Sequence, residues 1–235
     1  MSDRGSDRGS DRRPDRASDR RLDLSPGRIY ALARHAVVFE LRLYRSLFRW
    51  VTRRPDLGGP GDEHFTYAKA VTPVMWLWIF ASAAEVPLVH LLVPWEGVRF
   101  VLLLASVWGL VWMVGLLASL YVYPHLLGPA TLRVRYGASH SIMLPWDAVA
   151  SLAHRRQDLD SSVWTLQPRE TDSGIDLQVG VSGQVNVHAH LRRPTVVTTA
   201  KGPMEVVEVS FFADDPQALV AHARRIIAPQ DRRGR

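Results

Sequence analysis

A single carboxylate, Glu85, interrupts a long apolar run in the middle of this sequence. It precedes Pro94 by nine positions, or about 14 Å along a helix that rises ~1.5 Å per residue, which is close to the centre of a bilayer. A charge at that depth costs about 3 kcal/mol on insertion scales, so the carboxylate should be protonated or should face protein or water. The residue could therefore serve as a polar clasp, as a contact between subunits, or as a site for a proton, ion or ligand.

Trp108 and His90 are the candidate partners of Glu85. A helical hairpin that turns near residues 96–97 brings Trp108 level with Glu85, and the indole N–H could then donate to the carboxylate. His90 lies five residues further along, about 140° around an ideal helix, so it reaches Glu85 only if Pro87 kinks the helix. We expect a packing or assembly role for Glu85, with a proton, ion or ligand site as the alternative.

Arginine side chains form the second group of candidates, because guanidinium groups bind phosphate oxygens well. The candidates are two of the adjacent pairs in the C-terminal half of the chain and three arginines of the amphipathic segment in its N-terminal quarter. The candidate contacts for anionic lipid are Arg42, Arg45, Arg49, Arg155, Arg156, Arg192 and Arg193. The two C-terminal pairs can hold one headgroup only if the fold brings them together.

Composition and missing motifs exclude much other chemistry. The chain has no cysteine, so disulfides, thiolate metal sites and cysteine nucleophiles are excluded. His188 and His190 would share one face of a strand, but no third metal ligand is marked, and this pattern is typical of surface histidines. We find no nucleotide-binding, metalloprotease or hydrolase motif, and we predict no catalytic residue, metal or cofactor.

Residues 1–26 are predicted to be a disordered tail rich in arginine and aspartate. Aspartate recurs at every fourth position from 3 to 19, each followed by arginine, with almost no apolar side chain from which to build a core. The whole chain has a net charge of +6. The regular aspartates weaken the attraction of this tail to phosphates, so nucleic acid is not an expected partner.

Residues 27–54 are predicted to form a basic amphipathic helix, followed by a loop over 55–71. Apolar residues recur at spacings of three and four, with arginines on the opposite face. The apolar face comprises Ile29, Leu32, Ala36, Phe39, Leu43, Leu47, Trp50 and Val51. Such a helix beside a membrane span favours a position in the inner interface, where its arginines meet anionic headgroups. The alternative is that its apolar stripe packs on the C-terminal domain or on a second subunit.

Two apolar segments, 72–94 and 98–122, predict a transmembrane hairpin over 72–123. Each has about the ~20 residues needed to cross a bilayer core, and only WEG separates them. Basic residues flank the outer ends of the pair rather than the short turn, so both termini should face the cytoplasm. The protein is therefore expected to be a multi-pass protein of the cytoplasmic membrane. Small residues in the second segment could allow close helix contact, namely Ala105, Gly109, Gly115 and Ser119.

Residues 124–228 are predicted to form a cytoplasmic β domain, and 229–235 a disordered tail. Short β-type runs alternate with turn residues, and the last run leads into a helix capped by Asp215, with Pro216 at its first position. The predicted strands are TLRVRY, SIMLPW, AVASLAH, VWTLQP, IDLQV, QVNVHAHL, TVVTT and EVVEVSFF. The pattern predicts an α+β membrane protein whose small antiparallel β-barrel or sandwich is closed by a C-terminal helix.

One stretch, LRVRYGASHSIMLPWDAVASLAHRR, resembles the bacterial pleckstrin-homology-like (PH-like) domains that occur on short membrane hairpins. It is read as a strand, a turn and a second strand that ends in a proline–aromatic step. The final EVSFFADDPQALVAHARRI adds to the resemblance, and AEVPLVHLLVPW with the following span is similar to uncharacterised actinobacterial membrane proteins that carry such a domain. The resemblance covers roughly residues 64–227. It implies a PH-like fold and a membrane location, and it assigns no role to any residue.

Together these features predict a non-enzymatic integral membrane protein that presents a PH-like domain for protein interaction or oligomeric assembly. The expected partners are anionic lipids of the inner leaflet, together with a second copy of the chain or another membrane protein. The alternative is a small membrane enzyme or transporter subunit that uses Glu85, with or without His90.

Overall fold

The computed structural model describes residues 26–159, 165–199 and 202–233. The predicted disordered tail lies outside these ranges except for Pro26. Contacts divide the chain into two units, 1–37 and 38–235. The first unit contributes the opening turns of helix α1, and the second contains all the other elements.

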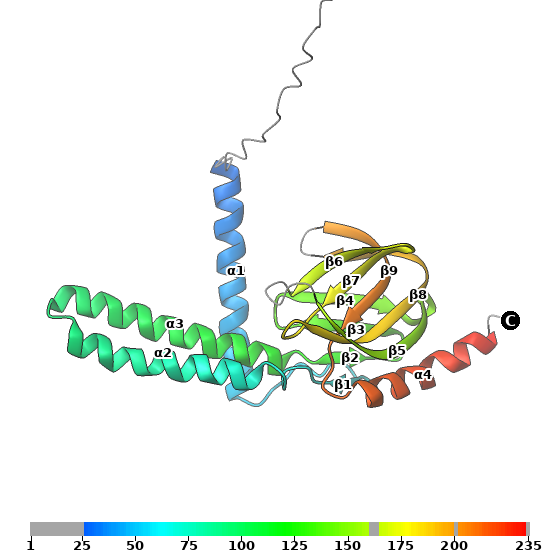
Figure 1. The fold of residues 1–235 in the computed structure, drawn as a ribbon, viewed down its shortest axis with the longest axis horizontal. Coiled ribbons are helices and arrows are strands. Elements are labelled where there is room, and N and C mark those ends of the chain that lie inside the picture. Colours follow the sequence, from blue (N-terminus) through cyan, green and yellow to red (C-terminus); the bar gives the residue numbers. More distant parts are fainter. Residues whose placement is uncertain (1–25, 160–164, 200–201, 234–235) are drawn as a thin grey trace, which may run out of the picture. The chain divides into compact units, whose positions relative to one another are not determined.

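Four α-helices and one short 3-10 helix form in the described part of the chain (Figure 1). They are α1 (Pro26–Val51), α2 (Thr72–Leu92), α3 (Glu96–Val122), η1 (Trp146–Ala148) and α4 (Pro216–Arg233). The predicted cap of α4 is confirmed, because the Asp215 carboxylate accepts a hydrogen bond from the Ala218 backbone N–H at 3.0 Å. α4 continues through Pro229 and ends at Arg233, which is five residues beyond the predicted domain end at 228.

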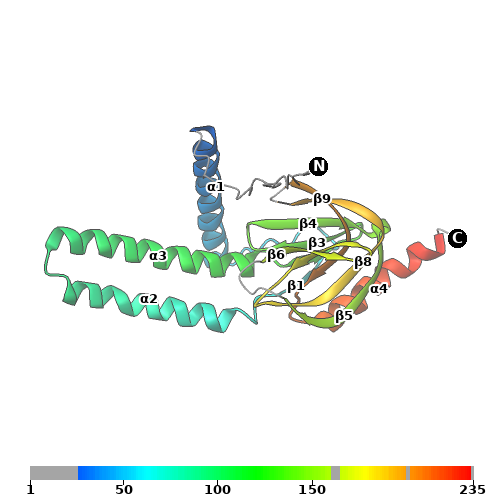
Figure 2. The same cartoon turned by 45° about the horizontal axis from the view of Figure 1, so that its top comes forward.

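Nine strands in the described residues form two sheets (Figure 2). The first sheet has the order β1-β2-β3-β4, and the second has the order β5-β8-β9-β7-β6. The strands are β1 (Glu63–Phe65), β2 (His125–Leu127), β3 (Thr131–Tyr136), β4 (His140–Pro145), β5 (Val149–Asp158), β6 (Leu166–Thr171), β7 (Gly174–Val179), β8 (Gln184–Thr199) and β9 (Gly202–Phe211). All neighbouring strands run antiparallel except β7 and β9, which pair in parallel.

One hydrophobic core lies between the two sheets. Strand alternation sends every second side chain inward, and α4 adds one apolar stripe at the β5 side. Trp146 is 1% exposed, and its indole N–H donates to the Gly128 carbonyl at 2.8 Å, which fastens η1 to the turn between β2 and β3. The protein is therefore an α+β protein whose β domain has a sandwich-type core.

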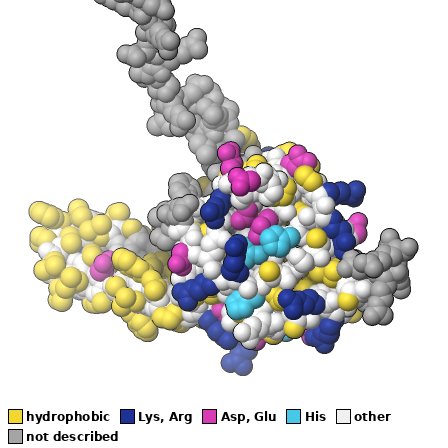
Figure 3. Space-filling model, turned by 45° about the vertical axis from the view of Figure 1, so that its right-hand side comes forward, with side chains coloured by type: hydrophobic (Ala, Val, Ile, Leu, Met, Phe, Trp, Pro, Cys, Tyr) yellow, Lys and Arg dark blue, Asp and Glu magenta, His cyan; other side chains and the backbone are white. Residues whose placement is uncertain are grey.

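The helices α2 and α3 are long and apolar enough to cross a membrane. Only 6% and 11% of their most apolar stretches are buried within the chain. Ile79 is the one buried residue described in α2, and those in α3 begin at Gly115. Hydrophobic side chains accordingly cover most of the visible surface of this hairpin, whereas charged side chains are spread over the β domain (Figure 3).

The second half of α1 packs on α3. The Phe39 and Trp112 rings lie 6.3 Å apart between centroids. Leu43 is 1% exposed, and a Cβ built on Gly115 would lie 2.9 Å from its Cγ. Gly115 therefore permits the close approach of the two helices that its size predicted. Part of the apolar stripe of α1 consequently contacts protein, although the contact is α3 rather than the C-terminal domain or second subunit named as alternatives.

Both ends of the hairpin are fastened to the β domain. Before α2, Tyr67 is fully buried; its hydroxyl accepts from the Gly137 N–H at 2.7 Å, and its ring stacks on His125 at 4.6 Å. After α3, only Tyr123 and Pro124 precede β2. Gly137 adopts a φ of +51°, which glycine tolerates, and this turns the chain between β3 and β4.

Three sequence predictions need correction. The barrel alternative is wrong, because the described strands form two open sheets whose end strands pair with one neighbour each. QVNVHAHL and TVVTT belong to one strand, β8, which bends at a register shift between His190 and Thr195. The loop predicted over 55–71 contains the strand β1, which pairs with β2. The sequence did not reveal β1 because a strand of three residues is too short to show a periodic pattern.

Candidate functional site

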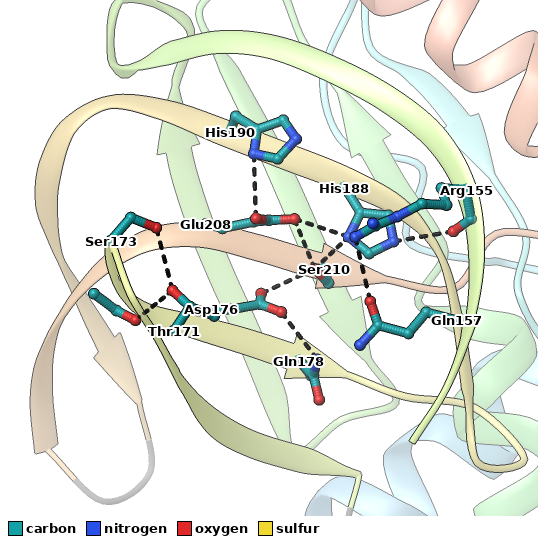
Figure 4. Close-up of polar contacts among 11 residues, drawn as sticks. Arg155, Gln157, Thr171, Ser173, Asp176, Gln178, His188, His190, Glu208 and Ser210 are labelled. Carbon is teal, nitrogen blue, oxygen red and sulfur yellow. Dashed lines mark hydrogen bonds and ion pairs between the residues drawn. The ribbon is translucent and has the colours of Figure 1, made fainter. Parts of the chain in front are cut away.

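Polar side chains alternate along three neighbouring strands on the sheet face that points away from the core. By register, residue 188 on β8 faces 210 on β9, and 190 faces 208; on β7, 176 and 178 face 208 and 210. We call these residues the His188 cluster: Asp176, Gln178, His188, His190, Glu208 and Ser210. Figure 4 shows their side chains turned toward one another. Four of them, Asp176, Gln178, His188 and Ser210, are buried.

A dense set of hydrogen bonds holds the His188 cluster together. His188 Nδ1 lies 2.8 Å from a Glu208 carboxylate oxygen and 2.9 Å from the Ser210 hydroxyl, while its Nε2 lies 3.0 Å from the Arg155 carbonyl. Ser210 donates to Asp176 at 2.9 Å. His190 contacts the second Glu208 oxygen at 3.2 Å. The surface assignment predicted for both histidines is therefore wrong for His188, which is 1% exposed.

The two carboxyl groups of the cluster have opposite pKa shifts. Burial raises the pKa of Asp176, although hydrogen bonds from Gln178 and Ser210 oppose that effect. The hydrogen bond from His188 lowers the pKa of Glu208, and burial opposes it only in part. Both ring nitrogens of His188 have hydrogen-bond partners, and Ser210 donates to Asp176.

This arrangement does not fit nucleophilic catalysis. A Ser-His-Asp triad uses opposite ring nitrogens for the serine and the carboxylate. Here Ser210 and Glu208 both meet Nδ1 of His188, and Nε2 is used by a backbone carbonyl. Ser210 is also fully buried. Among the described residues, no group of three or more histidines and carboxylates could hold a metal ion. The cluster is therefore placed to join β5, β7, β8 and β9.

An open cavity of about 460 Å³ lies over the His188 cluster. Arg155, Arg156 and Arg169 line it together with the cluster carboxylates Asp176 and Glu208. Three guanidinium groups thus face two carboxyl groups, so the cavity carries little surplus positive charge. This balance makes it a weak site for an anion.

The predicted contact between Trp108 and Glu85 is wrong. The Trp108 indole N–H instead faces Glu40 Oε1 at 3.1 Å and the Tyr44 hydroxyl at 2.9 Å, and Tyr44 itself donates to Glu40 at 2.9 Å. Trp108 does lie at the expected level of the hairpin, but its side chain faces α1 rather than α2. The charge that interrupts the amphipathic pattern of α1, Glu40, is the acceptor.

Glu85 and His90 are both exposed side chains on the continuous helix α2. Pro87 lies between them inside the helix. Over the part of the chain that the structure describes, neither side chain forms a hydrogen bond or ion pair with the other. The structure therefore does not join them into one site.

The paired arginines do not converge. Strand register places Ser151 opposite His190 and His154 opposite Val187, so 155–156 and 192–193 extend from opposite ends of the β5–β8 pairing. Residues 155–156 lie opposite position 186 of β8, which is six residues from Arg192. At ~3.3 Å per residue, the two arginine pairs are therefore about 20 Å apart along the strand. One headgroup therefore does not reach both pairs.

The three arginines predicted on α1 have different surroundings. Arg49 donates to the Arg54 carbonyl at 3.0 Å and lies 3.8 Å from the Asp56 carboxylate. Arg42 and Arg45 line a cavity with Arg135, which was not among the predicted lipid contacts. Arg135 lies on β3, and only the fold brings that strand next to α1.

Sequence reasoning missed most of the His188 cluster. The available signal was period-two polarity in three runs, as in HAH, EVS and DLQ, each within an otherwise apolar strand. Only the strand order β8-β9-β7 shows that the three runs meet. The chain matches no protein-family model, no curated protein and no solved structure.

Proposed function

We propose that the chain is an integral protein of the cytoplasmic membrane that presents its β domain for protein interaction or oligomeric assembly. The observation that carries this proposal is the direct attachment of the hairpin to the domain. Four residues separate α2 from Tyr67, which is buried in a small cluster with Ala68, Leu120 and Val181, and two residues join α3 to β2. A domain attached in this way keeps a fixed orientation at the membrane surface.

Further contacts strengthen the attachment at the inner ends of the helices. The Thr72 and Tyr121 hydroxyls lie 2.8 Å apart and link α2 to α3. The Lys69 backbone N–H donates to the Asp214 carboxylate at 3.1 Å, and the Asp214 N–H donates to the Thr66 carbonyl at 2.8 Å. The hairpin and the domain should therefore move together. This favours a role in which both take part in one assembly over a role in which the domain binds a ligand independently of the hairpin.

The PH-like assignment of the domain belongs to the same proposal. It is supported by a sandwich-type core covered by a single C-terminal helix, in keeping with the resemblance in the sequence. The parallel pairing of β7 and β9 is a departure from an all-antiparallel domain. We further propose that both termini face the cytoplasm, on the grounds of the arginines that flank the spans.

Site-specific photocrosslinking in native membranes tests the proposed function. A photoreactive residue is placed at Met143 or at Val196, whose side chains are 59% and 65% exposed on the β domain, and at Leu102 in α3 as a control. The proposal predicts that the domain positions capture one protein, identified by mass spectrometry as a defined membrane protein or a second copy. Absence of an adduct at both domain positions would contradict it.

Glu85 supports a second candidate function, that of a membrane enzyme or transporter subunit. Its carboxylate is exposed on α2 and has no partner within the described residues, so in a bilayer it would need a second subunit or a water-filled path. Glu85→Gln keeps the shape and much of the hydrogen bonding but removes ionisation. Full function in an assembled Glu85→Gln protein would exclude proton handling, and loss of assembly only in Glu85→Ala would favour a structural contact.

A further inference from the structure

Three arginines from distant parts of the sequence line one cavity of about 300 Å³. Arg42 and Arg45 come from α1, and Arg135 comes from β3. Asp56 is the only carboxylate in the lining, and Tyr123, the residue after α3, also lines the cavity. The volume is at the lower end of those that hold small ligands.

The cavity carries an excess of positive charge. The Asp56 carboxylate is shared, since the same oxygen lies 3.8 Å from Arg49 and 3.9 Å from Arg135. In the part of the chain that the structure describes, the guanidinium groups of Arg42 and Arg45 have no ion pair or hydrogen bond. Two positive charges therefore face the cavity without an acidic partner.

Arg135 is held rigidly in the wall of the cavity. Arg135 is 6% exposed, and its Nη1 donates to the Asp56 backbone carbonyl at 3.1 Å. Its guanidinium carbon lies 5.9 Å from the centre of the Tyr123 ring. Burial lowers the pKa of Arg135, because desolvation opposes the charged form. A fixed, partly desolvated guanidinium binds an anion with little ordering cost.

The turn between β3 and β4, together with the first two residues of β4, supplies neutral hydrogen-bonding groups to the same cavity. Ser141 is exposed, and its hydroxyl makes no hydrogen bond among the described residues. His140 contacts the Ser139 hydroxyl at 2.9 Å, and burial lowers its pKa, so the ring is neutral near pH 7. These groups can bond phosphate oxygens in addition to the arginines.

We infer that this cavity binds the phosphate group of an anionic membrane lipid. The location supports a lipid source, because Tyr123 directly follows the last residue of the apolar helix α3 and so marks the level of the headgroups. The cavity over the His188 cluster is a weaker candidate, because two carboxyl groups offset its three arginines. The inference rests on the proposed membrane location, but it does not depend on any protein partner.

Ligand binding by the whole 235-residue chain, purified in an uncharged detergent, tests the inference. The probes are dihexanoyl phosphatidic acid, dihexanoyl phosphatidylcholine and inorganic phosphate, and the dissociation constant of each is measured by calorimetry. We expect phosphatidic acid to bind at least about tenfold more tightly than the other two. Equal binding of inorganic phosphate would overturn the lipid assignment, and absence of binding by either anion would overturn the site.

Charge-matched variants separate this cavity from general electrostatic attraction. Arg42→Gln/Arg45→Gln alters exposed side chains and should weaken phosphatidic acid binding by about tenfold or more. Arg192→Gln/Arg193→Gln removes the same charge elsewhere and should leave binding unchanged. An equal loss in both double variants would overturn the inference. Failure of the proposed function would instead appear in the crosslinking experiment, which these binding measurements do not involve.

Discussion

The indole N–H of Trp108 lies 3.1 Å from the carboxylate of Glu40, and this contact joins α3 to α1. Trp108 precedes the end of α3 at Val122 by 14 residues, which is about 21 Å along the helix. Residues 39–44 of α1 cross α3 there, since Phe39 packs on Trp112 and Leu43 lies beside Gly115, and Glu40 finds its hydrogen-bond donors at this crossing.

Removal of the Trp108 donor should destabilise the contact between α1 and α3. Trp108→Phe keeps a ring but leaves Glu40 without its indole partner, at an expected cost of about 1–2 kcal/mol in unfolding free energy. Thermal unfolding of the purified chain in detergent measures this change. Trp95→Phe is the matched control, because Trp95 is 69% exposed near the hairpin turn. Equal effects of the two substitutions would show that the Glu40 contact contributes nothing.

The depth of α1 can be measured directly, since the chain has no cysteine of its own. Leu41 is 63% exposed on α1, close in sequence to the residues that contact α3. In membranes, Leu41→Cys should react slowly with a water-soluble maleimide, whereas Leu57→Cys, in the loop after α1, should react quickly. Equal labelling rates would place this part of α1 in water and would contradict a membrane location for the segment of α3 that it crosses.

The small residues of α3 provide a matched pair of substitutions. An added Cβ at Gly115 would meet Leu43 Cγ at 2.9 Å, whereas nothing lies within 4 Å of a Cβ at Gly109. Gly115→Ala should therefore destabilise the protein by about 1–3 kcal/mol through overpacking. Gly109→Ala should be neutral or stabilise it by up to about 1 kcal/mol, because alanine favours the helix. The same detergent unfolding assay compares them, and a stabilising Gly115→Ala would refute close packing on Leu43.

The sequence was sufficient for elements whose signal is local. Twenty-residue apolar runs predicted α2 and α3, and the Asp215–Pro216 start predicted α4, because these patterns depend on neighbours within a turn or a span. The strand β1 was missed because three residues carry no period. The continuity of β8 was missed because Arg192, Arg193 and Pro194 interrupt its apolar alternation, and only pairing with β9 carries the strand through.

The polar contacts were beyond the reach of the sequence for a related reason. Glu40 and Trp108 are 68 residues apart, and Asp56 and Arg135 are 79 residues apart. The level of Trp108 in the hairpin could be predicted from helical rise. The direction of its side chain could not, because it depends on where α1 crosses α3, and no periodicity encodes that crossing.

His125 should make the stability of the fold depend on pH. Its Nδ1 accepts from the Arg135 backbone N–H at 3.1 Å, and its Nε2 lies 2.8 Å from the Phe212 carbonyl, so the neutral ring with a proton on Nε2 fits the site. Burial lowers the pKa of His125 from 6.5 to about 4. Between pH 6.5 and about pH 4, the His125 ring is therefore protonated in the unfolded chain and neutral in the folded chain.

The stabilisation associated with His125 is consequently complete above about pH 6.5 and declines as the pH falls toward 4, by at most about 3 kcal/mol. Chemical unfolding of the purified chain between pH 7 and pH 4.5 measures this slope. His125→Asn keeps an acceptor for the Arg135 N–H but does not titrate, so its slope should be shallower, with a remainder from His140, whose pKa burial also lowers, and, at the acid end, from Glu208. His64→Asn, at an exposed position on β1, should retain the original slope. An unchanged slope in His125→Asn would show that another group controls the response to acid.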